Sequence, residues 1–315
     1  MAVTNFIDKS GLTMSPAEAE GIFVKKLYAS DLHNTGIRFM PGLKQETKLH
    51  TGKVNSLYSA YTCDFVPQAD AVLLEETSIK PEKLSVSLEE CYDEFRSTWM
   101  VAQTEASLNG GIPKDFYTYF FEDVMLKELD KEYEEIFWNA DKEAGEGYLA
   151  TANGILKQVK DNEHAVKVEG SALTVANILG EVEKVATKVM DLDNIDTTNY
   201  KIFMNYQDFR KLVTALGKAS ADGVKNIDTW SNYTRSGEKV YAFGFEVVPC
   251  RIEKGYMIAS DPSNLVLGFD VENNTEFKII DMRETTGSDS FRVRIITSIA
   301  AGIVYPETIV AYTQA

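Results

Sequence analysis

Cysteine is scarce in this sequence, and its placement excludes two kinds of small scaffold. The 315 residues contain three cysteines, Cys63, Cys91 and Cys250, an odd number with no two closely spaced. A disulfide framework needs cysteines in pairs, and a zinc knuckle needs pairs a few residues apart. We therefore expect neither, and a reducing cytoplasm is the natural compartment for the chain.

Histidine and the short catalytic motifs are equally sparse. His33, His50 and His164 lie far apart, and none has a cysteine or a second histidine beside it. The sequence contains no Gly-x-Ser-x-Gly nucleophile elbow and no Gly-Lys-Ser/Thr phosphate loop. We expect structural roles for the histidines, and we predict no catalytic residue, no metal site and no cofactor.

Basic residues are outnumbered, because 32 lysines and arginines face 48 acidic residues and the formal net charge is -16. Binding of nucleic-acid phosphates needs clustered cations, so the balance argues against a general nucleic-acid binder. No run approaches the roughly 18 apolar residues of a membrane-spanning helix, and the N-terminal segment lacks the apolar core of a secretory signal. With 44% hydrophobic residues, the chain reads as a soluble protein of one large or two moderate domains.

Two acidic groups could suggest chemistry, but a structural interpretation is favoured for each. Asp191, Asp193 and Asp196 begin like a calcium loop, yet Ile195 stands where that loop needs Asp or Asn, and Asp196 where it needs Gly. The second group lies in a charged helix surface, where acids normally only face solvent: Glu132, Glu134 and Glu135.

Arg292 and Arg294 alternate along a predicted strand and therefore point to one face of it. Two interpretations stay open for this pair. The guanidinium groups could meet acidic side chains across a subunit interface, or they could lie on a plain exposed face.

The longest predicted helix runs from Lys114 to Ala140. Pro113 suits its first turn, and apolar residues then recur every three to five positions: Phe116, Phe120, Val124, Leu129, Tyr133 and Phe137. Such a helix would be roughly 40 Å long, well above the mean of about 11–12 residues. Its charged outer surface suggests that other parts of an assembly cover it.

Two segments near the N-terminus also need outside support. Residues 14–32 predict a short amphipathic helix with Ser15 as its N-cap, and residues 34–67 read as a two-stranded excursion with a Pro41-Gly42 turn. A hairpin on its own is marginal in water.

The rest of the chain predicts alternating strands and helices. Residues 83–88 alternate as a strand, and residues 147–159 read as extended. Residues 171–190 read as a helix, and residues 201–204 as a buried strand that precedes a helix capped by Asn205. The chain from Val240 onward is mostly strand.

The order of several segments resembles that of a known family. These are KLSVSLEECYD, the long helix, KIFMNYQDFRKLVTAL, FGFEVVPC, NLVLGFD and GIVYPETIVAYT. Over residues 73–313 this order resembles the major capsid proteins of tailed double-stranded DNA phages, which have the Hong Kong 97-like capsid fold. The resemblance implies an α+β fold with an N-terminal arm, an extended β-hairpin loop, a peripheral domain with a long spine helix, and an axial domain.

The same resemblance implies domain boundaries. Residues 1–33 would be the N-terminal arm, 34–72 the extended loop, and 73–150 the peripheral domain with its spine helix. Residues 151–265 would form the axial domain, 266–298 the return strands of the peripheral domain, and 299–315 the closing strand of the axial domain.

The function implied is structural, not enzymatic. The protein would assemble as pentamers and hexamers into an icosahedral shell that encloses phage DNA without sequence-specific binding, and it would be found in the virion after assembly in the host cytoplasm. The arm begins almost at Met1, so the resemblance also implies a separate scaffolding protein or a chain already trimmed. A portal and decoration proteins are further expected partners, and no membrane is expected.

Some family members crosslink a loop lysine to a peripheral-domain asparagine. Lys44, Lys48 and Lys53 are loop candidates here, but no asparagine occurs between Glu276 and Pro306, where the partner is expected. We therefore predict no autocatalytic isopeptide bond.

Two other functions are considered. An encapsulin-type compartment uses the same fold and would hold an enzyme cargo instead of DNA. An acidic α/β enzyme would need a cleft with convergent polar groups, and the sequence offers none.

Overall fold

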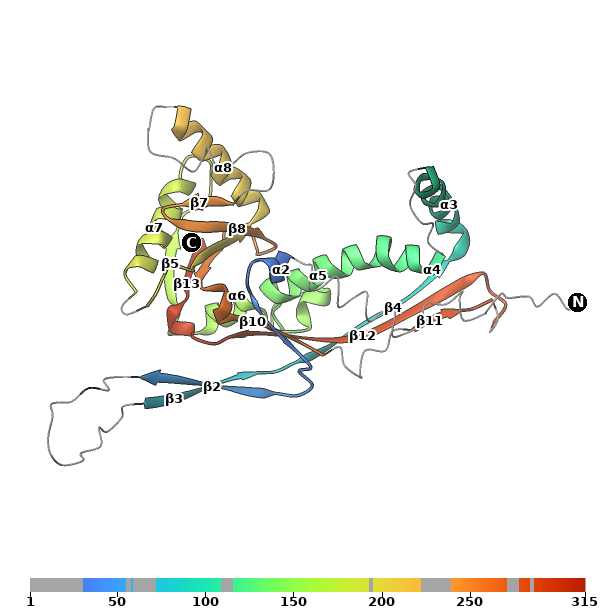
Figure 1. Cartoon of the computed structure of the whole chain (residues 1–315), viewed down its shortest axis with the longest axis horizontal. Helices are drawn as coiled ribbons and strands as arrows, with labels where there is room; N and C mark the ends of the chain where they lie inside the picture. Colours follow the sequence, from blue (N-terminus) through green and yellow to red (C-terminus); the bar gives the residue numbers. More distant parts are fainter. Residues whose placement is uncertain are drawn as a thin grey trace, which may run out of the picture.

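The computed structural model describes residues 31–54, 58, 72–108, 116–192, 195–221, 239–270, 278–283 and 286–314. Figure 1 shows an elongated molecule, with a body of short strands and helices at one end and a long flat layer that extends from it. The predicted helix at residues 14–32 falls almost entirely outside the described ranges, which begin with α2 (Asp31–Asn34).

A six-stranded sheet forms the compact body, and distant parts of the sequence alternate in it. In spatial order its strands are β5 (Val166–Gly170), β13 (Val310–Gln314), β9 (Met257–Ser260), β6 (Lys201–Asn205), β8 (Phe245–Cys250) and β7 (Val240–Ala242). β13 runs parallel to β5, and β6 runs parallel to β8, while the other neighbours are antiparallel. The predicted buried strand at 201–204 is confirmed.

This sheet separates two hydrophobic cores, because successive side chains of a strand point to opposite faces. Ile202 and Met204 of β6 pack against helices α7 (Ile178–Met190) and α8 (Tyr206–Ala221). Phe203 lies between them and faces the other way, with its ring 5.1 Å from that of Trp138. The body is therefore covered on both faces.

A second sheet forms the long layer around β12 (Ser290–Ile303). Its other strands are β1 (Arg38–Pro41), β10 (Leu265–Phe269), β11 (Lys278–Asp281) and β4 (Glu82–Cys91). Along β4, partly buried and exposed residues alternate without a break. This confirms the predicted strand, with Leu84, Val86 and Leu88 on the inner face.

The predicted long helix is confirmed at residues 116–139, but it is not uniform. α4 (Phe116–Tyr119) leads into a π-helical segment, η2 (Phe120–Met125), and then into α5 (Leu126–Asn139). The π-helical segment, which the periodicity did not predict, buries Phe120 and Phe121. The ring of Phe120 stands 4.9 Å from that of Phe291 on β12, so the helix covers the inner face of the long layer.

The two-stranded excursion differs from its prediction. Its strands are β2 (Thr47–Val54) and β3 (Val72–Ile79), which pair antiparallel and project from the molecule (Figure 1). The expected bounds of 34–67 were therefore wrong, because β1 joins the long layer beside β10 and the return strand lies beyond Pro67.

Two other predictions need correction. Residues 147–159 are not extended: they contain a short 3-10 helix, η3 (Gly147–Ala150), and the start of α6 (Ile155–Asp161), which buries Ile155, Leu156 and Val159 on one side. The helix expected from residue 171 begins at Ile178, because the side chain of Asn177 accepts a hydrogen bond from the backbone of Thr174 and holds a turn there. α3 (Tyr92–Leu108) completes the main elements.

Candidate assembly surfaces

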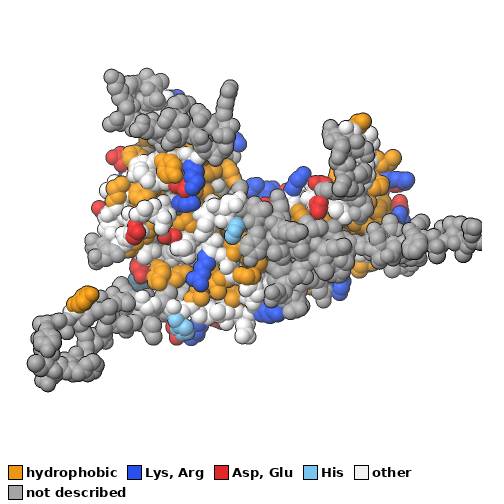
Figure 2. Space-filling view, in the orientation of Figure 1, with side chains coloured by type: hydrophobic (Ala, Val, Ile, Leu, Met, Phe, Trp, Pro, Cys, Tyr) orange, Lys and Arg blue, Asp and Glu red, His pale blue; other side chains and the backbone are white. Residues whose placement is uncertain are grey.

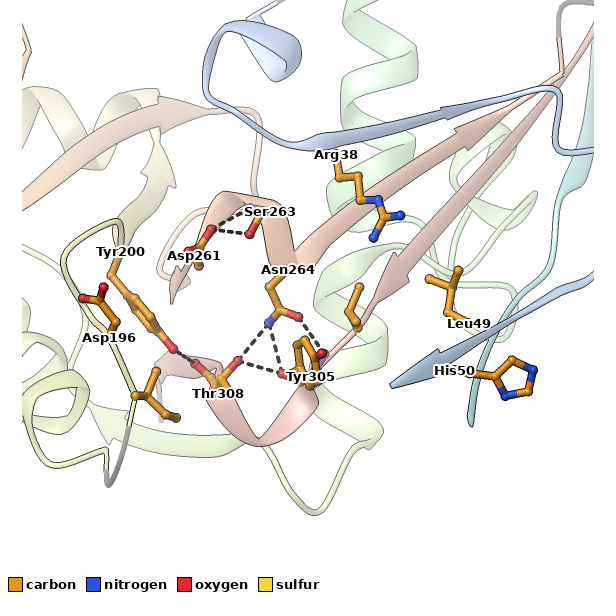
Figure 3. A pocket seen from close by; sticks show the side chains of 12 residues that line it. Arg38, Leu49, His50, Asp196, Tyr200, Asp261, Ser263, Asn264, Tyr305 and Thr308 are labelled. Atoms are coloured by element: carbon orange, nitrogen blue, oxygen red, sulfur yellow. Dashed lines mark hydrogen bonds between the residues drawn. The ribbon is translucent and has the colours of Figure 1, made fainter. Parts of the chain in front are cut away.

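A pocket of about 460 Å³ lies between the base of the β2–β3 hairpin and the six-stranded body (Figure 3). Arg38, Leu49 and His50 form the wall on the hairpin side. The opposite wall comes from two short 3-10 helices, η4 (Pro262–Asn264) and η5 (Pro306–Thr308), and from the loop that leads to Tyr200.

The polar groups of the opposite wall are already engaged with one another. The Asn264 amide donates to the Tyr305 carbonyl and to the Thr308 hydroxyl, each over 3.0 Å, and its oxygen accepts from the Tyr305 backbone N–H at 2.6 Å. The Tyr200 hydroxyl donates to the Thr308 carbonyl at 2.9 Å. These bonds fix η4 against η5, and they leave no activated nucleophile among the described groups of this wall.

The three histidines lie at separate places in the structure. The His33 ring lies 5.0 Å from that of Phe39, and His50 Nδ1 lies 3.5 Å from a carboxylate oxygen of Glu76. The backbone N–H of His164 donates to the side chain of Asn162. No group of three His, Cys, Asp or Glu residues in the described ranges could hold a metal ion.

The predicted acidic groups behave differently from one another. Asp196 accepts hydrogen bonds from the backbone N–H and hydroxyl of Thr198, which lower the pKa of its carboxyl, and so it closes a local turn. Glu134 was expected to face solvent, and that was wrong. It is buried, and its carboxylate accepts from the Arg251 backbone N–H at 3.0 Å and pairs with the Arg251 guanidinium at 3.2 Å.

This carboxylate fastens the long helix to the six-stranded body. Beside it, the Asn139 amide donates to the Arg251 carbonyl at 2.6 Å, and its oxygen accepts from the Glu253 backbone N–H at 2.7 Å. The end of α5 therefore satisfies the backbone polar groups of a loop that follows β8. Sequence reasoning missed this contact because Glu134 and Arg251 are 117 residues apart.

The hairpin is anchored at its base only, as far as the described residues show. Ile79 is buried there in a small apolar cluster with Leu43, Val266 and Ala300. Farther out, its side chains pair across the two strands, as Lys48 and Glu76 do at 2.7 Å. Of the other two loop lysines, Lys44 is exposed, and the side chain of Lys53 lies outside the described part.

The sequence of this chain matches no protein-family model and no curated protein. Solved structures, however, match it almost end to end. A chain from a satellite phage P4 procapsid that includes the size determination (Sid) protein covers 93% of this chain and 98% of its own length, with a TM-score of 0.60 and 10% identity. A chain from the capsid of a native GTA particle covers 90% and 89%, with a TM-score of 0.53 and 11% identity.

The protein has the Hong Kong 97-like capsid fold. The α+β class and the fold predicted from the sequence are thereby confirmed. A chain from a virus-like particle of Pyrococcus furiosus also matches, over 94% of this chain and 98% of that one, with a TM-score of 0.50 and 11% identity. At identities this low, the structural likeness establishes the fold alone. The surfaces that this chain offers to partners depend on its own residues.

One surface of this capsid fold is the outer face of the long layer, where Arg292 and Arg294 lie. Arg292 pairs with Glu89 on the adjacent strand at 2.8 Å, which lowers the pKa of the Glu89 carboxyl. Arg294 lies beside Ser87 and Lys278 in the register and has no carboxylate partner among the described residues. Arg292 is thus paired within the chain, and Arg294 lies on the exposed face of the strand.

A second surface is α3, which stands at the far end of the long layer (Figure 1). Met100, Val101 and Leu108 on this helix expose 56%, 58% and 81% of their surface. Figure 2 shows apolar side chains gathered at this end of the molecule. None of the helices in the described ranges is both long and apolar enough to cross a bilayer.

Proposed function

We propose that the protein is a major capsid protein that assembles as pentamers and hexamers into an icosahedral shell around the DNA of a tailed phage. The observation that carries the proposal is the end-to-end likeness to a chain of a phage procapsid, 93% of this chain against 98% of that one. The subunit also has parts that project from the compact body, namely the β2–β3 hairpin and α3 (Figure 1).

The physical character of those projecting parts supports the proposal. The hairpin is anchored only at its base, and α3 exposes three large apolar side chains. A two-stranded hairpin and an exposed apolar helix are poorly stabilised in water. Heterologous contacts that close into rings would bury both, as a shell requires.

We assign the parts of the fold as follows. The six-stranded body is the axial domain, and the long layer with its helix is the peripheral domain, whose spine is the helical stretch 116–139. The β2–β3 hairpin is the extended loop, and residues 1–33 are the N-terminal arm. The expected scheme (34–72, 73–150, 151–265, 266–298 and 299–315) changes in two places: β1 (Arg38–Pro41) joins the long layer, and the return strand of the hairpin continues to Ile79.

The partners follow from this role. We propose a separate scaffolding protein, a portal and decoration proteins, with assembly in the host cytoplasm and a final place in the virion. Contact with DNA would not depend on sequence. The isopeptide prediction also stands, so mature particles should show no ladder of covalent multimers on a denaturing gel.

Expression of the full chain, alone and with a candidate scaffolding protein, tests the proposal. Electron microscopy should show closed shells, and sedimentation should show particles far heavier than the 35.2 kDa chain. A protein that stays near 35 kDa at high concentration in both conditions would contradict it.

An encapsulin-type compartment is the second candidate, and the likeness to the Pyrococcus furiosus virus-like particle favours it. The two roles differ in what the shell contains. Purified particles with double-stranded DNA and no folded protein cargo would support the phage role. Particles with a single enzyme and no DNA would support the compartment.

A further inference from the structure

The turn between β7 and β8 has an unusual residue at its first position. Ala242 pairs with Phe245, so the turn consists of Phe243 and Gly244 only. Their φ angles are +53° and +90°, and Phe243 is the one residue other than glycine with positive φ among those described. Two positive φ angles in a two-residue turn define type I′.

Phenylalanine is poorly suited to this position. The left-handed region brings Cβ close to the following carbonyl, and type I′ turns therefore favour Asn, Asp or Gly at their first position. An Asn-Gly turn would hold the same hairpin with less strain. The local fold gives no reason for a phenylalanine here, and strained positions of this kind are concentrated at functional sites.

The side chain is also not buried by its own subunit. Phe243 exposes 42% of its surface and Tyr241 exposes 39%. β7 is the last strand of the six-stranded sheet, so the turn lies at the edge of the body. The charged side chains beside it do not balance, since Lys239 and Lys201 share the single carboxylate of Glu246, at 3.1 and 3.2 Å, which leaves one positive charge.

The charge of this edge indicates what covers it. Each chain carries a net charge of -16, so two copies repel wherever unpaired acids face each other. An apolar ring that projects from an edge with one excess positive charge is a place where a second, acidic copy can approach without repulsion between acids. Ring-closing contacts, moreover, set an edge of one copy against a different surface of the next.

We propose that Phe243 is an assembly contact, whose ring inserts into an apolar recess on the axial domain of a second copy of this chain. The inference rests on the proposed capsid function. It adds a specific role for the β7–β8 turn: the strain stored at Phe243 is retained because the ring contributes to subunit association.

The substitutions Phe243→Asn and Phe243→Gly test this with two measurements, one of subunit stability and one of assembly. The subunit should become more stable, while the shell should become harder to form. Below the concentration at which the wild type assembles, the unfolding midpoint of the variants should rise by roughly 2–4 °C, because the turn strain is relieved. The subunit concentration needed for shell formation should rise about tenfold or more, because a central aromatic contact is lost.

Two further variants control the experiment. Phe243→Trp keeps an aromatic ring and the turn strain. This variant should form shells at the wild-type concentration, and its unfolding midpoint should be unchanged. Met190→Asn removes another exposed apolar side chain of the same domain, 60% exposed at the end of α7, and should not affect assembly.

The outcomes distinguish failure of the Phe243 contact from failure of the proposed capsid function. Phe243→Asn shells that form at the wild-type concentration would overturn the contact, and so would a lower unfolding midpoint, because the ring would then serve the fold. A wild type that forms no shell under any condition would overturn the proposed function itself.

Discussion

At the residue scale, the Glu134–Arg251 pair shows how two regions of the chain are held together. The Glu134 carboxylate is buried, while about a third of the Arg251 side chain is exposed. Removal of the carboxylate leaves the Arg251 backbone N–H without its acceptor, and an unsatisfied buried donor costs about 1–3 kcal/mol. We expect Glu134→Ala to lower the unfolding free energy by about that amount in urea titrations.

Glu128→Ala, on the same helix, is the matched control. Glu128 pairs with Lys131 at 2.5 Å, but 61% of its side chain is exposed. Exposed pairs contribute little, so this variant should unfold at nearly the wild-type midpoint. Equal losses in the two variants would show that helix propensity, and not the buried pair, sets the effect.

Asp281, at the end of β11, makes the stability of the long layer depend on pH. Its carboxylate accepts from the hydroxyls of Tyr92 and Tyr117 at 3.3 and 3.2 Å and pairs with Arg283 at 2.9 Å. Burial alone would raise the pKa of Asp281, but the bonds from Arg283 outweigh burial and lower the pKa below its ordinary 3.8.

The sign of the pH effect follows from that lowered pKa. The unfolded chain then binds more protons than the folded one near pH 4, so the contribution of Asp281 is complete above that pH and is lost on acidification through the folded pKa. We expect the difference in unfolding free energy between wild type and Asp281→Asn to shrink below pH 4. A difference that stays constant from pH 7 to pH 3 would show that the carboxyl charge plays no part.

At the element scale, the hairpin is separable from the rest of the fold. Its anchor is Ile79 in the small cluster at the base, and the described strands β2 and β3 pair only with each other. Replacement of residues 48–78 by a short Gly-Ser linker should leave cooperative unfolding and the far-ultraviolet circular dichroism largely intact. Shell formation should be lost.

The matched deletion removes a different segment, residues 222–238, with the same kind of linker. If both deletions abolish shells, the hairpin has no special role. If the hairpin deletion alone unfolds the subunit, β2 and β3 belong to the core and not to an assembly surface.

The elements also show what local sequence can and cannot predict. The alternation in β4 and the apolar spacing of residues 116–137 are local patterns, so the strand and the long helix were predicted correctly. The return strand β3 was missed because its partner in the register, Thr47 opposite Ile79, is 32 residues away. α6 was missed because only Ile155, Leu156 and Val159 mark its buried side. Glu134 was misjudged because burial by a distant loop leaves no mark on its neighbours in sequence.

At the scale of the whole molecule, net charge opposes the assembly that the fold supports. Every copy carries a charge of -16, and repulsion between copies reaches over about 30 Å at 0.01 M salt but only about 8 Å at 0.15 M. Apolar contacts such as those proposed for α3 and Phe243 do not weaken over this range. The wild type should therefore form shells more readily as salt rises from 0.01 to 0.15 M.

Charge reversal on the outer face of the long layer sharpens this expectation. Lys83 and Arg294 are exposed and have no carboxylate partner among the described residues. In a chain with excess acid, each is a place where a neighbour's carboxylate gains by approach. Lys83→Glu with Arg294→Glu should shift the salt required for shell formation upward, measured by light scattering, whereas Lys83→Gln with Arg294→Gln should shift it less. Wild-type assembly that weakens as salt rises would mean that complementary charges, and not screened repulsion, control association of this chain.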